Sequence, residues 1–207
     1  MKQLRVGALL LALSLGAAAV VLGEDRGSSS ATPGRATVET SVQAPDVLGV
    51  FARPRDAGDA VPARLIRSGP VQPGELRSQS RRVRIGRAVA YLWPARDSVC
   101  YLAPVGGGCM PVSRIARRGL DVAILAQAQP QTGRYMRFRA FGLARDGITA
   151  VELVLGDGRT TAAPVVHNAF YGAARGAPPV AVRWNELGRA RQLRLRQLTS
   201  GEIETLR

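Results

Sequence analysis

The sequence predicts a mainly β protein, an antiparallel β-sandwich or partly open barrel with one or two short helices, preceded by an N-terminal transmembrane helix. Three observations support this prediction: short segments in which residues of one face are apolar, tight-turn signals such as Asp157-Gly158 between them, and an uncharged apolar run at the N-terminus. Alternation with a period of two places one face of each strand in a core. Long helical segments that would join parallel strands are missing from the pattern, so the strands are expected to be antiparallel.

The apolar run predicts export from the cytoplasm. Lys2 and Arg5 precede eighteen uncharged residues, Val6–Gly23. Basic residues followed by an apolar stretch are typical of an exported chain whose basic end stays in the cytoplasm. The run is just long enough to span a bilayer, but residues 17–19 also offer a small-x-small cleavage site. Residues 1–23 are therefore either a signal anchor, giving a single-pass membrane protein, or a signal peptide, giving a secreted one.

The composition after the run divides the chain into three further parts. Residues 24–45 are small and polar and are expected to form a flexible linker. Residues 46–185 are expected to form one extracytoplasmic β-rich domain, and residues 186–207 a basic C-terminal helix or tail. Asp46 is a candidate N-cap for a first short helix that Pro54 would limit. A second short helix is expected near Ala57–Asp59.

Strand patterns begin near Val83. Arg87–Trp93 and Val99–Ala103 are expected to form a hairpin, which Gly106–Gly108 would end. One helical turn capped by Ser113 is expected within Pro111–Arg118. The remaining strands are expected at Asp121–Gln127, Tyr135–Phe141, Val151–Leu155, Arg159–Val166 and Val180–Trp184.

The two cysteines, Cys100 and Cys109, are expected to form a structural disulfide. They close a loop of ten residues, and an exported domain experiences conditions in which disulfides persist. Their spacing differs from that of a C-x-x-C redox motif, and two cysteines with one histidine cannot complete a structural zinc site. Two free buried thiols, or a redox or metal role, remain open as alternatives.

The chain is strongly basic, with 29 Lys and Arg against 15 Asp and Glu and a net charge of +14. The basic residues are densest in Glu75–Arg87 and Arg183–Arg196. Each patch is either a solvated face or a contact for an anionic partner such as lipid or an envelope polymer; nucleic acid is not expected outside the cytoplasm. The contact interpretation predicts that the arginines of the first patch cluster with the C-terminal arginines on one face. These candidate contact residues are Arg77, Arg81, Arg82, Arg84 and Arg87.

The sequence assigns no catalytic, cofactor-binding or metal-binding residue. His167 is the only histidine, and the chain has no G-x-S-x-G nucleophile motif. The leading hypothesis is therefore a non-enzymatic envelope interaction or accessory module. One alternative is a cell-envelope hydrolase that uses His167 or an unidentified pair of carboxylates. Another is a carbohydrate-binding module in which Tyr91, Trp93 and Tyr101 line a sugar-binding face.

Two segments carry a resemblance to a known group of proteins. They are residues 89–109, VAYLWPARDSVCYLAPVGGGC, and residues 141–172, which contain Gly142-Leu143, Asp146-Gly147-Ile148, Asp157–Thr160, Pro164-Val165 and Asn168. These segments resemble uncharacterised exported proteins of high-GC actinobacteria. The resemblance covers about a quarter of the chain. It implies an exported β-rich domain and carries no activity.

Overall fold

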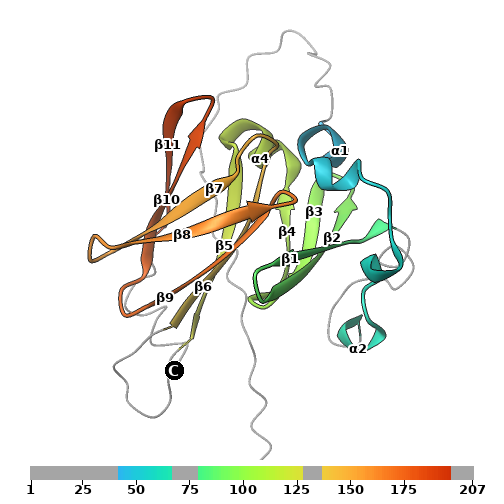
Figure 1. Cartoon of the computed structure of the whole chain (residues 1–207), viewed down its shortest axis with the longest axis horizontal. Coiled ribbons are helices and arrows are strands. Elements are labelled where there is room, and N and C mark those ends of the chain that lie inside the picture. The colour runs from blue at the N-terminus through green and yellow to red at the C-terminus, as the bar shows by residue number, and fades with distance from the viewer. Residues whose placement is uncertain (1–41, 67–78, 128–136, 197–207) are drawn as a thin grey trace, which may run out of the picture.

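Two antiparallel sheets form the core of the computed structural model, which describes residues 42–66, 79–127 and 137–196 (Figure 1). The smaller sheet has the strand order β1-β2-β3-β4, and the larger has the order β11-β10-β7-β8-β9-β6-β5. The prediction of a mainly β, antiparallel fold is confirmed. None of the helices in the described ranges is long and apolar enough to cross a membrane, and the run Val6–Gly23 lies outside those ranges.

The strands of the smaller sheet are β1 (Arg81–Ile85), β2 (Ala88–Ala95), β3 (Ser98–Ala103) and β4 (Gly106–Pro111). Those of the larger sheet are β5 (Leu120–Gln127), β6 (Arg137–Ala144), β7 (Ala150–Leu155), β8 (Thr160–Val166), β9 (Ala169–Arg175), β10 (Pro179–Glu186) and β11 (Arg189–Arg194). The helical elements are the α-helices α1 (Ala44–Val47), α2 (Ala63–Ile66) and α4 (Val112–Arg118) and the 3₁₀ turns η1 (Gly49–Phe51) and η2 (Ala57–Asp59).

The larger sheet curls so that β6 and β9 have apolar neighbours on both faces. Along β6, Phe141 and Leu143 pack against the smaller sheet, whereas Ala140 and Ala144 pack against the core formed with β7 and β10. Neighbouring residues of one strand thus belong to two different apolar clusters. This arrangement explains why β6 is buried almost continuously from Ala140 to Ala144.

Two glycines allow close packing in the larger sheet. A Cβ atom at Gly142 would lie against the Phe170 ring and 2.6 Å from the carbonyl oxygen of Asp121. A Cβ atom at Gly172 would lie 2.6 Å from Leu153 Cδ1. Both distances are shorter than van der Waals contact. A larger residue at Gly142 would displace its neighbours on the paired strands β9 and β5, and one at Gly172 would push β7 away from β9.

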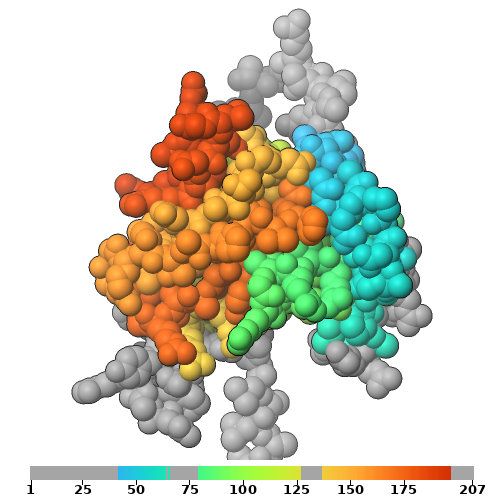
Figure 2. Space-filling model, in the orientation of Figure 1, coloured from blue at the N-terminus to red at the C-terminus, as the bar shows by residue number. Residues whose placement is uncertain are grey.

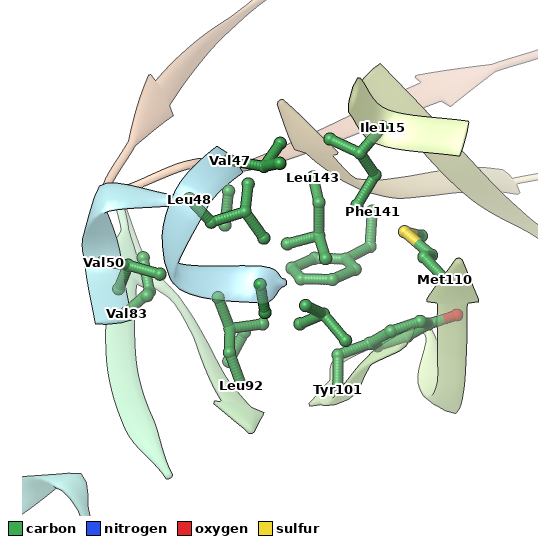
Figure 3. Close-up of a cluster of buried hydrophobic side chains, with 14 of the residues drawn as sticks. Val47, Leu48, Val50, Val83, Leu92, Tyr101, Met110, Ile115, Phe141 and Leu143 are labelled. Atoms are coloured by element: carbon green, nitrogen blue, oxygen red, sulfur yellow. The ribbon is translucent and has the colours of Figure 1, made fainter. Parts of the chain in front are cut away.

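The smaller sheet and residues 44–51, the N-terminal segment of the described domain, close the first apolar cluster, which contains Phe141 and Leu143. Leu48 and Val50 reach it from the segment around α1 and η1, Leu92 from β2, and Phe141 from β6 (Figure 3). All four side chains are buried. Tyr101 lies beside Phe141, with 4.7 Å between the ring centroids.

Three predictions about local structure are corrected. Residues 106–108 were expected to end a strand but lie within β4. A Cβ atom at Gly108 would lie 2.9–3.2 Å from the hydroxyl and ring atoms of Tyr101, so glycine leaves room for that side chain. Asp46 is the third residue of α1, behind Gln43 at the N-cap position. Helix α4 begins after Pro111 at its N-cap, so Ser113 is inside it.

The C-terminal prediction also needs correction. Residues from 186 onward were expected to form a basic helix or tail, but β10 continues to Glu186 and β11 pairs with it antiparallel. The turn consists of Leu187 and Gly188, whose φ angles are 49° and 76°. Positive φ at both positions matches the tight hairpin turn that joins adjacent strands. Strand β9, which follows a second such turn at His167-Asn168, was not predicted either.

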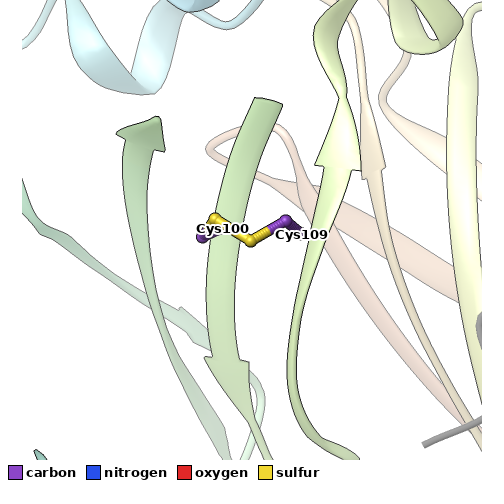
Figure 4. The surroundings of a disulfide bond; sticks show 2 residues. All are labelled: Cys100 and Cys109. Carbon is purple, nitrogen blue, oxygen red and sulfur yellow. A yellow bond between two sulfur atoms is a disulfide. The ribbon is translucent and has the colours of Figure 1, made fainter. Parts of the chain in front are cut away.

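The disulfide between Cys100 and Cys109 is confirmed (Figure 4). The two cysteines are directly paired across β3 and β4, with 3.8 Å between their Cα atoms. Cys100 is buried against Tyr91 and Trp93 on the outer face of the smaller sheet, whereas Cys109 is exposed. The bond therefore fastens the edge strand β4 to its neighbour.

Reducing this disulfide should lower the free energy of unfolding by about 2.5–3 kcal/mol, because the unfolded chain loses the constraint of a ten-residue loop. Urea unfolding of the full chain in uncharged detergent, with and without a phosphine reductant, measures the difference. A Cys100→Ala/Cys109→Ala variant is the control and should not respond to the reductant. Equal stability of the oxidised and reduced protein would contradict the prediction.

Candidate functional site

Asn168 anchors the N-terminal segment to the larger sheet. Its side-chain oxygen accepts a hydrogen bond from the backbone N–H of Val50 at 2.8 Å, and its amide nitrogen donates to the carbonyl of Ala144 and to Asp146 Oδ1. Asp146 Oδ1 also accepts from the N–H of Gly49. Because Asn168 is buried, this network has a structural role.

Asp59 forms a second buried anchor, next to the predicted contact residues of β1. Its carboxylate accepts hydrogen bonds from Arg53, from the N–H of Asp56 and from the N–H of Arg82. Burial raises the pKa of Asp59, but the bonds from Arg53 and the two backbone groups outweigh it and hold the pKa at about 2. Ser80 Oγ donates to the carbonyl of Asp59 and completes the attachment.

The five arginines predicted to contact an anionic partner have different environments. Arg81 is half-buried and donates to the carbonyls of Gln79, Ser80 and Phe51. Arg82 is also half-buried, and its Nε has no hydrogen-bond partner within the described ranges. Arg84 and Arg87 are exposed, and Arg77 lies outside the described residues.

The expected clustering with the C-terminal arginines is not observed. Strand β1 contacts β8 and β9, whereas β10 and β11 form the other end of the larger sheet beyond β7. Figure 2 shows β7 and β8 between the red hairpin and the green strands. Arg84 and the β11 arginines are therefore two separate basic regions.

His167 does not have the surroundings of a catalytic base. It occupies the turn between β8 and β9 with a φ of 47°, and its side chain is exposed. Within the described ranges its imidazole makes no hydrogen bond or ion pair. The hydrolase alternative required a Ser and a carboxylate within hydrogen-bond reach of this residue, and the structure places none there among the residues it describes.

The aromatic residues of the smaller sheet are buried. Trp93 is 4% exposed and Tyr91 8% exposed, and they pack with Val61 and Cys100 on the outer face of the sheet. Tyr101 lies in the core between the two sheets. The carbohydrate-binding alternative required Trp93 or Tyr91 to be exposed in a groove, and this condition is not met.

The buried carboxylate of Asp121 also has a structural role. Burial raises its pKa, and Arg114, whose guanidinium lies 3.2 Å from Asp121 Oδ2, opposes the shift. Burial likewise raises the pKa of Tyr101 to about 12, with a contribution from the negative charge of Asp121. The described residues contain no group of three or more His, Cys, Asp or Glu side chains that could hold a metal ion.

The strongest candidate surface is the β10–β11 hairpin. Residues 183–196 contain five arginines and one glutamate, and Arg183, Arg189, Arg191 and Arg194 are all exposed. Glu186 is turned inward and pairs with Arg145 at 2.6 Å and with Arg191 at 3.6 Å. The single acidic residue of the hairpin thus neutralises little of its outward charge.

A depression of about 420 Å³ lies on the outer face of the same strands. Its floor includes the cross-strand row Ala162, Glu152, Arg183 and Gln192, which runs from β8 to β11. Arg183 Nε donates to Gln192 Oε1 at 2.9 Å, so the guanidinium is held on the β11 side. Alanines at 150, 162 and 190 leave space around this charged row.

The charge of this hairpin is evident from the sequence, but its conformation was not predicted. The segment Arg189–Arg196 was considered for a helix, although Leu193 and Leu195 alternate with arginines as in a strand. Gly188 between Glu186 and Arg189 is the signal for the turn. Asn168 was likewise missed as an anchor, although Asn is one of the residues that tolerates positive φ in a turn.

The chain matches no protein-family model, and comparison with curated proteins and with solved structures finds no match.

Asp59 generates a prediction about pH. Because its folded pKa of about 2 lies below the ordinary 3.8, its ionised form stabilises the fold above pH 4, and this contribution is lost as the pH falls through 2. The pH-dependent part is at most about 2.5 kcal/mol. Asp59→Asn should cost about 3 kcal/mol near pH 6, since it removes the buried charged partner of Arg53 and leaves only the exposed Asp56 at 3.7 Å.

The check is urea unfolding of the full chain between pH 2 and pH 7. The difference between wild type and Asp59→Asn should shrink toward pH 2. Asp97→Asn is the matched control, because Asp97 is exposed and its ion pair with the exposed Arg96 is long, at 3.9 Å. A difference that stays constant with pH would show that ionisation of Asp59 does not support the fold.

Proposed function

We propose that this domain is a non-enzymatic, extracytoplasmic interaction module that holds an anionic partner through the β10–β11 hairpin. The observation that carries the proposal is the concentration of exposed arginines on a hairpin at the end of the larger sheet. Figure 2 shows this hairpin projecting from the upper left of the molecule. Glu186 is the one acid of the hairpin and pairs with Arg191, so Arg183, Arg189 and Arg194 remain for anionic groups of a partner.

The geometry of Arg183 supports binding rather than simple solvation. Its Nε is occupied by Gln192, which orients the guanidinium, and its two Nη groups make no hydrogen bond to a described residue. A planar guanidinium with two available donors suits a carboxylate or phosphate group. The depression beside it gives such a group access.

The extracytoplasmic location is supported by two independent features. One is the apolar run Val6–Gly23 behind Lys2 and Arg5, and the other is the disulfide, because structural disulfides persist in oxidising compartments. On this proposal the domain is held at the membrane by the run, or secreted if the run is cleaved. Anionic lipid headgroups and acidic envelope polymers are the partners that such a location offers.

The non-enzymatic part of the proposal is supported by the roles of the titratable groups. Asp59 and Asp121, the buried acids of the described ranges, are each paired with an arginine. His167 lies exposed on a turn, and its imidazole has no hydrogen-bond or ion-pair partner among the residues that the structure describes. No observation on these residues favours hydrolysis over binding.

The hairpin should account for binding to polyanions more than an equally basic region elsewhere. Arg189→Gln/Arg194→Gln should weaken binding of the full chain, in uncharged detergent, to poly-L-glutamate and to polyphosphate by about tenfold and reduce its salt dependence. Fluorescence anisotropy over a range of salt concentrations measures both effects. Arg84→Gln/Arg87→Gln is the matched control, because it removes two exposed arginines from the other basic region.

The control variant should keep most of the affinity. If the two double variants weaken binding equally, general attraction by a basic protein explains the result and the proposed hairpin site is wrong. The same conclusion follows if the wild-type chain binds neither polymer.

A further inference from the structure

The backbone of β11 has one edge that no described strand pairs. β11 is the last strand of the larger sheet, and its partner on the other side is β10. In a two-residue hairpin the residues that flank the turn exchange both backbone hydrogen bonds. Glu186 and Arg189 flank this turn, and further along the pair the N–H of Leu195 donates to the carbonyl of Val180 at 2.9 Å. Odd-numbered residues of β11 therefore bond to β10.

The even-numbered residues of β11 face the open edge. The N–H and C=O groups of Ala190, Gln192 and Arg194 point away from β10, at intervals of about 6.8 Å along the strand. β11 contains no proline and no bulge in its pairing with β10. It therefore has the regular row of donors and acceptors that another strand requires.

The charge on β11 selects the kind of strand that can pair. Arg189 and Arg191 lie on one face of β11 and Arg194 lies on the other, and all three are exposed. Side chains that are directly opposite in neighbouring strands lie about 5 Å apart, so unlike charges attract and like charges repel there. A second copy of β11 would place basic strands side by side, which is unfavourable. A strand with regularly spaced carboxylates is favoured.

We propose that the β11 edge accepts an extended, acidic segment of another polypeptide as an additional strand of the larger sheet. This inference rests on the proposed function, because the same arginines attract the partner. It adds that backbone pairing, with the side-chain charges, selects an acidic polypeptide over a phosphate polymer or a lipid headgroup. Main-chain hydrogen bonds supply affinity, and the arginines supply the preference for acidic side chains.

The test separates backbone pairing from charge. Gln192→Pro removes an N–H that points to the open edge without removing a bond to β10, and proline is tolerated in edge strands at such positions. Gln192→Ala is the matched control, because it removes the same side chain and keeps the N–H. The probe is a labelled peptide of about ten residues in which Glu alternates with Thr, a residue favoured in strands.

With the full chain in uncharged detergent, Gln192→Pro should weaken binding of this peptide by about tenfold, and Gln192→Ala by less than about threefold. Binding of polyphosphate should weaken to the same extent in both variants, since each removes the Gln192 side chain that orients Arg183 and neither alters the charge. If Gln192→Pro and Gln192→Ala bind the peptide equally, strand addition is wrong and the proposed anion site stands. If Arg189→Gln/Arg194→Gln also leaves binding of both probes unchanged, the proposed function fails as well.

A second measurement on the wild-type chain covers the case in which Gln192→Pro does not fold. Saturating peptide should slow amide hydrogen exchange at Ala190, Gln192 and Arg194 by about tenfold, because their N–H groups become hydrogen-bonded. Polyphosphate should leave exchange at these three amides unchanged, since it offers no strand to pair. Unchanged exchange with bound peptide would overturn strand addition.

Discussion

The layer made by β5, β6 and β9 is the constraint on which the rest of the structure depends, because it must be buried on both faces. Phe141 and Leu143 face the smaller sheet, and Phe170 and Ala140 face the core formed with β7 and β10. The smaller sheet covers one face of this layer. The other face is covered by β7 and β10 of the larger sheet itself, which must curl to bring them there. Packing within the layer requires Gly142, which leaves room for the ring of its cross-strand neighbour Phe170, and the approach of β7 to β9 requires Gly172.

The N-terminal segment is part of this core. Leu48 and Val50 are almost completely inaccessible to solvent and pack in the cluster that contains Phe141. Hydrophobic burial alone would not fix the position of such a short segment, because its backbone groups also need partners. Asn168 provides one of them by accepting from the N–H of Val50 while donating to Ala144. A buried amide therefore connects the start of the domain to the turn between β8 and β9.

The sequence was informative wherever one face of a strand is apolar and a turn has a distinctive composition. The Asp157-Gly158 hairpin and the pairing of Cys100 with Cys109 follow from such local signals and are confirmed. Strand β9 was missed because its first residues pack in both clusters and Gly172 and Ala173 are small and apolar, so its sequence shows no alternation in polarity although Ala173 and Arg175 are exposed. The composition of Arg189–Arg194 is compatible with a helix as well as with a strand. Its pairing with β10 establishes the strand. The buried roles of Arg53 and Asn168 depend on contacts that are remote in sequence, so no local pattern reports them.

The separation between core and hairpin explains how a basic edge can persist in this domain. β11 contributes only a partly buried Leu193 to the second cluster, and its arginines are exposed. Stability is concentrated in the layers around β6, so the outward side chains of β11 are little constrained by packing. A sheet edge with free backbone groups normally carries charge because charge discourages pairing with other copies. The same charge leaves the edge open to an acidic strand, so protection against self-association and selection of a partner require the same residues.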